Sequence, residues 1–312
     1  MITIGATVTD EKYITGFRRT LLNKTVAACS YVVLLIVNIN IKQSIVTNDD
    51  VDYSFYLGPG YQNEQGEGRA PKIISPHSSC FDIQTLCTVF KGNCGFVAGA
   101  FMKKVPIFGS LAAKLGTLFV PRAAEQSALD KSLETILKRT ELIEQKREFP
   151  PLVIFPEGST TNNTTLCKFR RGAFFDLRKV QPVTLKYKHG MVHPAIESLD
   201  EPFTVFLLCC TLTPMFVEVK KLPVFAPTEY LFTKHADKGK EKWEIFAWAC
   251  RDIMSKVGGF GKFDIAYRDK IKVYDYYMGK INSLTFENGV SVEYREDGCY
   301  INDSEKIIKK EQ

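Results

Sequence analysis

Two short apolar runs that each end in a polar loop constrain the fold of this chain most. Lys72–Ser75 leads into Pro76–Asp82, and Pro151–Ile154 leads into Phe155–Asn162. Short apolar runs bounded by turn residues are typical of buried strands. Ligands bind where such strands end in open α/β sheets. The two loops therefore favour a functional site.

The rest of the chain alternates short apolar runs with amphipathic stretches. Residues 94–99 and 117–120 read as strands, whereas 127–148 and 242–257 have apolar residues at helical spacing. This alternation predicts an α/β fold, with a largely parallel sheet flanked by helices. The run 215–225 reads as an edge-type strand, because Pro223 stands near its end.

Three regions are expected along the chain. Residues 1–68 form an N-terminal lead-in, 69–264 the catalytic domain and 265–312 a C-terminal extension. Within the lead-in, Thr25–Ile41 is apolar over about seventeen residues, the lower limit for crossing a bilayer. It predicts a membrane-associated segment, either spanning or half-inserted. A core helix and a signal peptide are the alternatives. The run 203–217 is too short to span and is expected to be buried or interfacial.

The first polar loop holds a histidine and an acid that can pair. If a helix begins just after His77, Asp82 lies little more than one turn away, within reach of the imidazole. A carboxylate on one ring nitrogen leaves the other free to act as a general base. For this motif alone, a capped helix start with a buried polar pair is the simpler alternative. The second loop could likewise be a glycine turn with a hydroxyl cap.

Charge and cysteine content narrow the class of protein. The net charge is +6 with scattered basic residues, which makes nucleic acid a poor partner and favours an anionic membrane or phosphate-bearing substrates. Nine cysteines without a Cys-x-x-Cys pair indicate a reducing, cytosol-facing domain. His189 and His193 have metal-pair spacing, but Gly190 and Pro194 interrupt any helix there, so no metal site is expected.

Four blocks in order carry a resemblance to a known family: His77–Asp82, Gly116–Arg122, Phe155–Gly158 and Val180–Val183. The chain resembles the glycerolipid acyltransferases of the 1-acylglycerol-3-phosphate type. With Lys168–Phe174 included, it is most similar to the lysophosphatidylcholine and lysophosphatidylethanolamine acyltransferases. The similarity covers roughly residues 70–260.

This resemblance implies transfer of an acyl chain from acyl-CoA to the free glycerol hydroxyl of lysophosphatidylcholine or lysophosphatidylethanolamine. His77 would be the general base, and Asp82 would orient its imidazole. Acyl-CoA is a co-substrate, and no cofactor is expected. Cys80 is not needed as a nucleophile, since the hydroxyl can attack the thioester directly.

The other blocks are assigned to binding the phosphoglycerol part of the substrate. By match to the family pattern, this concerns Arg122, Glu157 and Gly158, with Ser159 where relatives commonly have threonine. Lys168 lies in a basic and aromatic cluster that could hold coenzyme A phosphates or a lipid headgroup, although a solvated basic turn is equally plausible.

Several alternatives stay open. A lysophosphatidate or glycerol-3-phosphate acyltransferase would share all four blocks, and a non-catalytic lipid-binding protein is a remote alternative. A serine hydrolase is disfavoured because no Gly-x-Ser-x-Gly motif is present. Lys309 and Lys310 resemble a dilysine signal, so an endoplasmic reticulum membrane with a cytosolic catalytic domain is expected. The pattern does not predict the oligomeric state.

Overall fold

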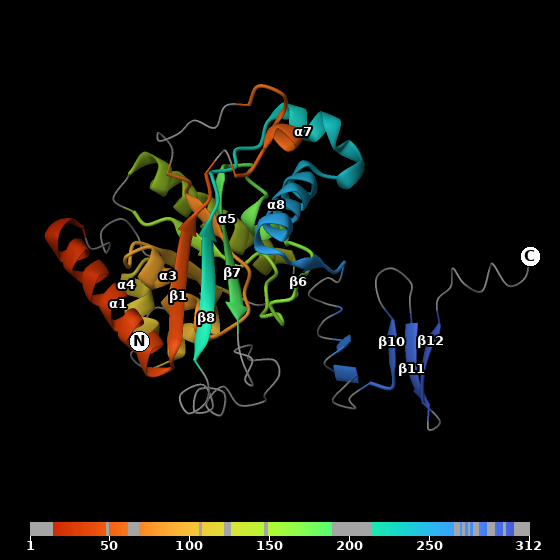
Figure 1. The fold of residues 1–312 in the computed structure, drawn as a ribbon, viewed down its shortest axis with the longest axis horizontal. Coiled ribbons are helices and arrows are strands. Elements are labelled where there is room, and N and C mark those ends of the chain that lie inside the picture. Colours follow the sequence, from red (N-terminus) through yellow and green to blue (C-terminus); the bar gives the residue numbers. More distant parts are fainter. Residues whose placement is uncertain are drawn as a thin grey trace, which may run out of the picture.

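A seven-stranded sheet forms the centre of the molecule (Figure 1). The computed structural model describes residues 15–47, 50–61, 69–105, 108–121, 126–146, 149–188 and 214–264, with short stretches between 269 and 302. The strand order is β1-β8-β7-β2-β5-β3-β4. The strands are β1 (Ile39–Ile45), β2 (Lys72–Ile74), β3 (Gly95–Gly99), β4 (Leu118–Val120), β5 (Leu152–Ile154), β7 (Val180–Lys188) and β8 (Met215–Lys221).

The sheet is largely parallel, as predicted. Strands β7, β2, β5, β3 and β4 run in one direction, β8 and β1 run in the other, and β7–β8 is the antiparallel pairing. The prediction that β8 is an edge strand was wrong, because β1 pairs with it along residues 39–45. Pro223 lies beyond the end of β8 and interrupts no pairing in it.

Helices cover both faces of this sheet (Figure 1). Neighbouring strand residues point to opposite faces, so Ile74 packs with α5 and α8 while Ile73 packs with α1 and α3. The helices and helical turns of the body are α1 (Gly16–Ile36), α2 (Ser54–Leu57), α3 (Asp82–Val89), η2 (Ala100–Lys104), α4 (Phe108–Lys114), α5 (Gln126–Gln145), η3 (Arg171–Ala173), α7 (Glu229–Lys234), η5 (Ala236–Lys238) and α8 (Lys242–Gly258).

The apolar segment predicted at residues 25–41 is a helix followed by a strand. Helix α1 ends at Ile36, and Asn38 adopts the left-handed backbone conformation with a φ of 56°. This turn lets Ile39–Ile45 enter the sheet as β1. Asparagine tolerates that conformation better than most residues, because its short amide can bond locally. The predicted continuous apolar segment was therefore wrong beyond Ile36.

Helix α1 lies along the domain instead of projecting from it. The guanidinium of Arg19 donates to the carbonyl oxygens of Lys114 (2.9 Å) and Leu115 (3.2 Å) at the end of α4. Near the start of β3, a Cβ on Gly92 would meet the carbonyl oxygen of Asn23 at 2.1 Å. Only glycine permits this close approach, so Gly92 allows α1 to dock at this position.

The opposite face of α1 exposes large apolar side chains. By length and composition, α1 is the helix within the described part of the chain that could cross a membrane. Its buried positions are Arg19, Val26, Ser30 and Leu34. The exposed ones include Phe17, Leu21, Tyr31, Val32, Leu35 and Ile36.

Two smaller sheets complete the structure. Strands β6 (Thr165–Leu166) and β9 (Gly261–Lys262) pair in parallel. Strands β10 (Ser283–Thr285), β11 (Ser291–Arg295) and β12 (Gly298–Asn302) form an antiparallel sheet, drawn in blue in Figure 1. The domain limits at 68 and 264 stay a prediction, although β1 belongs to the same sheet as the strands of the predicted catalytic domain.

Candidate active site

The two polar loops lie side by side because β2 and β5 are parallel neighbours, with Ile74 opposite Ile154. Their following loops therefore leave the same edge of the sheet. The backbone N–H of Thr161 donates to the carbonyl oxygen of His77 at 2.7 Å, which joins the two loops directly. The edge of a parallel sheet where strands end is a common place for a site.

His77 and Asp82 form the contact that their spacing predicted. Asp82 is the first residue of α3, and its Oδ2 lies 2.8 Å from Nδ1 of His77. An ionised carboxylate only accepts, so Nδ1 carries the proton and Nε2 of the neutral ring is an acceptor. The Asp82 side chain is fully buried, whereas the His77 side chain is 23% exposed. The imidazole thus joins a buried carboxylate to the surface.

The buried carboxylate of Asp82 is held by four donors. Besides the imidazole, Oδ2 accepts the backbone N–H groups of Ser78 (2.7 Å) and Ser79 (2.9 Å). Oδ1 accepts the hydroxyl of Tyr187 at 2.7 Å. Hydrogen bonds to both oxygens offset the cost of removing the charge from water.

The ring of His77 stacks on Phe155, the residue that follows β5. Their ring centroids lie 4.1 Å apart and their planes differ by 16°. Stacking on Phe155 holds the face of the ring, and the hydrogen bond to Asp82 holds its Nδ1 edge. Phe155 opens the Phe155–Gly158 block but was not among the predicted site residues.

Glu157 faces the protein interior. Its side chain is 2% exposed, and its oxygens accept the backbone N–H groups of Cys167 (2.9 Å) and, at 3.4 Å, of His77. It therefore couples the loop after β5 to the loop that carries the imidazole. Glu157 thus holds the two loops together through their backbone, and its predicted contact with substrate stays a prediction.

Gly158 needs to be glycine for two reasons. Its φ of 77° lies in the left-handed region, and a Cβ there would sit 2.8 Å from Cδ and Nη1 of Arg170. Arg170 thus lies across the backbone of the loop. The sequence pattern places this arginine only in a basic and aromatic cluster. Ser159 is half-buried on the same loop, and Lys168 is exposed.

Asn163 and Tyr187 are the residues that sequence reasoning missed. Asn163 donates to Oγ of Ser78 (2.6 Å) and to the carbonyl oxygen of Leu185 (2.8 Å), and it accepts the backbone N–H of Tyr187 (2.7 Å). The sequence did contain a signal that Tyr187 is buried. Val183, Leu185 and Tyr187 alternate along β7 and therefore share one face of the strand.

Known proteins resemble the part of the chain that carries the two polar loops. An acyltransferase family model matches residues 65–196, which include both polar loops. Lysophosphatidylcholine acyltransferase 1 of Danio rerio is 31% identical over 198 residues, which are 63% of this chain and 35% of that protein. These matches make residues 65–196 of this chain similar to the acyltransferase family.

Two further proteins are similar to this chain. Lysophospholipid acyltransferase LPEAT1 of Arabidopsis thaliana is 27% identical over 276 residues, covering 85% of this chain and 67% of that protein. The crystal structure of the 1-acyl-sn-glycerophosphate acyltransferase PlsC from Thermotoga maritima superposes with a TM-score of 0.48 at 14% identity, covering 77% and 80% of the two chains. This chain spans about a third of the length of the Danio rerio protein.

Some predicted positions fall outside the described residues. These are Arg122, His189 and His193, as well as 203–213 in the apolar run. Among the residues that the structure does describe, no group of three metal-ligating side chains is present.

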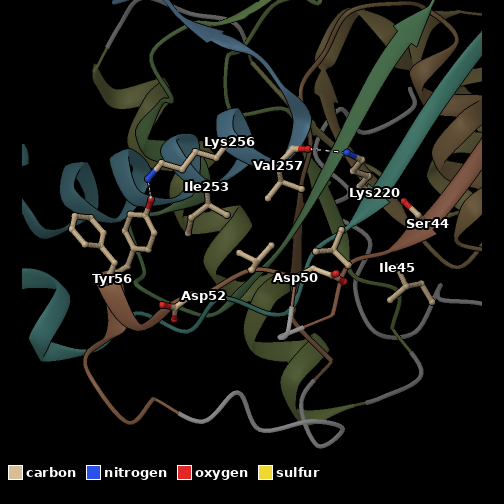
Figure 2. Close-up of a pocket in the computed structure, with 12 residues that line it drawn as sticks. Ser44, Ile45, Asp50, Asp52, Tyr56, Lys220, Ile253, Lys256 and Val257 are labelled. Carbon is tan, nitrogen blue, oxygen red and sulfur yellow. Dashed lines mark hydrogen bonds between the residues drawn. The ribbon is translucent and has the colours of Figure 1, made fainter.

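A separate hollow of about 580 Å³ lies between the end of β1, α2 and α8 (Figure 2). Its lining contains no described residue of the two polar loops. Strand β1 runs opposite to β2, so the chain leaves β1 towards the amino-terminal ends of the parallel strands. In Figure 2, Lys256 reaches the hydroxyl of Tyr56, and the two atoms lie 2.8 Å apart. This hollow is not part of the candidate active site.

Proposed function

We propose that this protein is a membrane-bound lysophospholipid acyltransferase with His77 as its general base. It transfers an acyl chain from acyl-CoA to the free glycerol hydroxyl of lysophosphatidylcholine or lysophosphatidylethanolamine. The acyltransferase family match supports the reaction class, and the names of the Danio rerio and Arabidopsis thaliana relatives support the substrate class.

One observation carries the proposal: a buried, fully bonded carboxylate holds Nδ1 of a partly exposed imidazole. The distance from Nδ1 to Oδ2 is 2.8 Å, and Asp82 is closed off from solvent. The basic atom Nε2 is then available at the side of the ring away from Asp82. A histidine that only packed in the core would not need two loops and a strand to fix the orientation of its ring.

The reaction needs one proton to move out and back. Nε2 of His77 removes the proton of the glycerol hydroxyl while the oxygen attacks the thioester carbonyl carbon. Asp82 stabilises the imidazolium that forms. Collapse of the tetrahedral intermediate breaks the carbon–sulfur bond, and the coenzyme A thiolate leaves as the thiol after taking up the proton. The ester forms without an acyl-enzyme, so Cys80 has no covalent role.

The loop after β5 supplies the proposed binding surface for the polar parts of the substrates. Lys168, Arg170 and Arg171 are exposed on the segment that follows Glu157. Their charges suit coenzyme A phosphates or a phospholipid headgroup. Arg122, Gly158 and Ser159 are proposed to meet the phosphoglycerol part.

Contact with the bilayer is proposed through the exposed face of α1. Because α1 is docked on α3 and α4, its apolar outer face is presented along the side of the domain. A helix docked on a domain with an apolar outer face can lie in the interface of a membrane. Placement at the endoplasmic reticulum, facing the cytosol, stays a prediction.

A headgroup panel tests the proposed function. The purified protein is mixed with one acyl-CoA and, in turn, with lysophosphatidylcholine, lysophosphatidylethanolamine, lysophosphatidate and glycerol-3-phosphate. We expect transfer to the first two acceptors. His77→Ala should lower kcat by about 10²- to 10⁴-fold, the usual contribution of a general base, in a protein with unchanged thermal unfolding.

The outcomes separate the alternatives. Preference for lysophosphatidate or glycerol-3-phosphate would move the protein to the synthesis of phosphatidate with the same chemistry. Transfer that persists at the wild-type rate in a folded His77→Ala variant would contradict the mechanism. No transfer to any acceptor would contradict the proposed function as a whole.

A further inference from the structure

The carboxylate of Asp82 is held from two directions, and only one of them is local in sequence. Ser78, Ser79 and the imidazole all reach Oδ2. The opposite oxygen, Oδ1, accepts the hydroxyl of Tyr187 on β7, at 2.7 Å. Tyr187 is separated from Asp82 by 105 positions and is 5% exposed.

We propose that Tyr187 is a positioning residue for the His77–Asp82 pair. The inference rests on the proposed function, because it assigns Tyr187 a part in the same acyl transfer. A carboxylate held at one oxygen can still turn about its Cβ–Cγ bond, whose rotational preference is broad. A hydrogen bond from the sheet to the other oxygen, Oδ1, sets the plane of the carboxylate and aims Oδ2 at Nδ1 of His77.

Tyr187 can serve this purpose because its own backbone is fixed. Its N–H donates to Oδ1 of Asn163, whose amide also donates to the carbonyl oxygen of Leu185 and to Oγ of Ser78. The Asn163 side chain, directly after the second polar loop, therefore ties β7 to the first polar loop. Asn163 adopts a φ of 61°, which asparagine tolerates better than most residues.

The tyrosine stays a donor over the working pH range. Burial raises the pKa of Tyr187 well above its usual value, and the negative charge of Asp82 raises it further. Its hydroxyl therefore does not ionise near neutral pH. The Tyr187 hydroxyl orients the Asp82 carboxylate, which accepts the N–H of the imidazole, and it transfers no proton to or from the substrate.

This role predicts a change in turnover rather than in substrate binding. Tyr187→Phe keeps the ring in the core and removes only the hydroxyl. We expect kcat to fall about ten- to a hundred-fold, the range typical when an outer hydrogen-bond partner that orients a metal-ligating histidine is removed, because Tyr187 orients the partner of His77 in the same way. The KM values for both substrates should stay within about twofold, since Tyr187 touches neither in this mechanism.

Tyr53→Phe is the matched control. Tyr53 is equally buried, at 3%, and its hydroxyl donates to the carbonyl oxygen of Pro223 at 2.9 Å, in another part of the fold. Both variants lose one buried hydroxyl donor. A general loss of stability would affect them alike, whereas the proposal requires kcat to fall only in Tyr187→Phe.

A spectroscopic signal keeps the test independent of activity. The proton on Nδ1 of His77 gives a nuclear magnetic resonance signal that His77→Ala identifies by its loss. In Tyr187→Phe we expect this signal to move and to exchange faster with water, and in Tyr53→Phe to stay unchanged. An unchanged signal in Tyr187→Phe would overturn the inference.

Two results with an active enzyme would also overturn the inference. One is wild-type turnover in Tyr187→Phe, and the other is an equal loss of turnover in Tyr53→Phe. If the wild-type protein transfers no acyl group, the proposed function fails while the signal still decides whether Tyr187 positions the pair.

Discussion

At the scale of single residues, Asp82 combines two tasks that are usually separate. It accepts the backbone N–H groups of Ser78 and Ser79 in the loop ahead of α3, and it orients the His77 imidazole. The same carboxylate therefore fixes the loop and the proposed general base. The alternative of a capped helix start was wrong, because the residue before α3, Phe81, makes no side-chain capping hydrogen bond and Asp82 accepts from residues that precede the helix.

Gly158→Ala should weaken both the loop and the activity. A φ of 77° costs a residue with a Cβ about 1–2 kcal/mol, and the Arg170 side chain would have to leave its place over the loop. We expect lower stability against urea by about this amount and a reduced kcat/KM for acyl transfer. Urea unfolding and initial-rate assays measure the two effects.

Gly172→Ala offers the control for that change. Gly172 has no positive φ, and no atom lies within 4 Å of the position of its Cβ. The same added methyl group should leave stability and rate almost unchanged. If Gly158→Ala behaved in the same way, the backbone argument would be wrong.

At the scale of elements, α1 is a component of the catalytic fold as well as an apolar helix. Arg19 bonds the carbonyl groups at the end of α4, and the strand after Asn38 completes the sheet. A helix that crossed the bilayer would have to give up these contacts. The arrangement therefore supports the proposed contact of its outer apolar face with lipid.

Leu21→Glu combined with Leu35→Glu should abolish binding to phospholipid vesicles. Both side chains are more than half exposed on α1, so the domain should keep its fold while carboxylates replace the apolar contact. Sedimentation with vesicles measures binding, and circular dichroism checks the fold.

Phe263→Glu serves as the comparison, because Phe263 is similarly exposed but lies beyond β9, away from α1. It should leave vesicle binding intact. Retained binding of the double variant would show that another part of the chain makes the contact.

At the scale of the whole molecule, one carboxylate joins distant parts of the chain. Asp252 on α8 accepts the hydroxyl of Tyr56 from α2 and pairs with Lys256 and with Lys262 on β9. Burial of Asp252 opposes its ionisation, but these donors outweigh it and lower its pKa from 3.8 to about 2. Burial also raises the pKa of Tyr56 to about 12, so the hydroxyl stays a donor.

The protein should therefore lose stability in acid as Asp252 becomes protonated. The pKa of Asp252 is lower in the folded than in the unfolded chain, so its contribution is present above about pH 4 and is lost as the pH falls towards about 2. Asp252→Asn should lower the thermal midpoint at neutral pH and flatten the loss of stability in that window.

Thermal unfolding across this pH range measures the effect. Asp237→Asn is the reference, because Asp237 pairs with Lys238 at the exposed surface, where ion pairs contribute little. Parallel stability curves for wild type and Asp252→Asn would contradict the assignment.

Local patterns by themselves determined the α/β class, the parallel strands before both polar loops, and the contact between His77 and Asp82. Each depends on residues close together in the chain: apolar periodicity within an element, or a carboxylate about one helical turn from an imidazole. The same patterns placed Ile39–Ile41 in one apolar membrane-associated segment with the residues before them and mistook β8 for an edge, because the pairing of β1 with β8 joins segments about 175 residues apart.

Only the tertiary structure decided how the site is supported. Tyr187 reaches Asp82 across 105 positions, Asn163 reaches Ser78 across 85, and Glu157 reaches the N–H of His77 across 80. A side chain's type and spacing do not reveal such partners, because they depend on which strands become neighbours. Strand order places the loop after β5 and the end of β7 against the start of α3, and hydrogen bonding between them then follows from the burial of their polar groups.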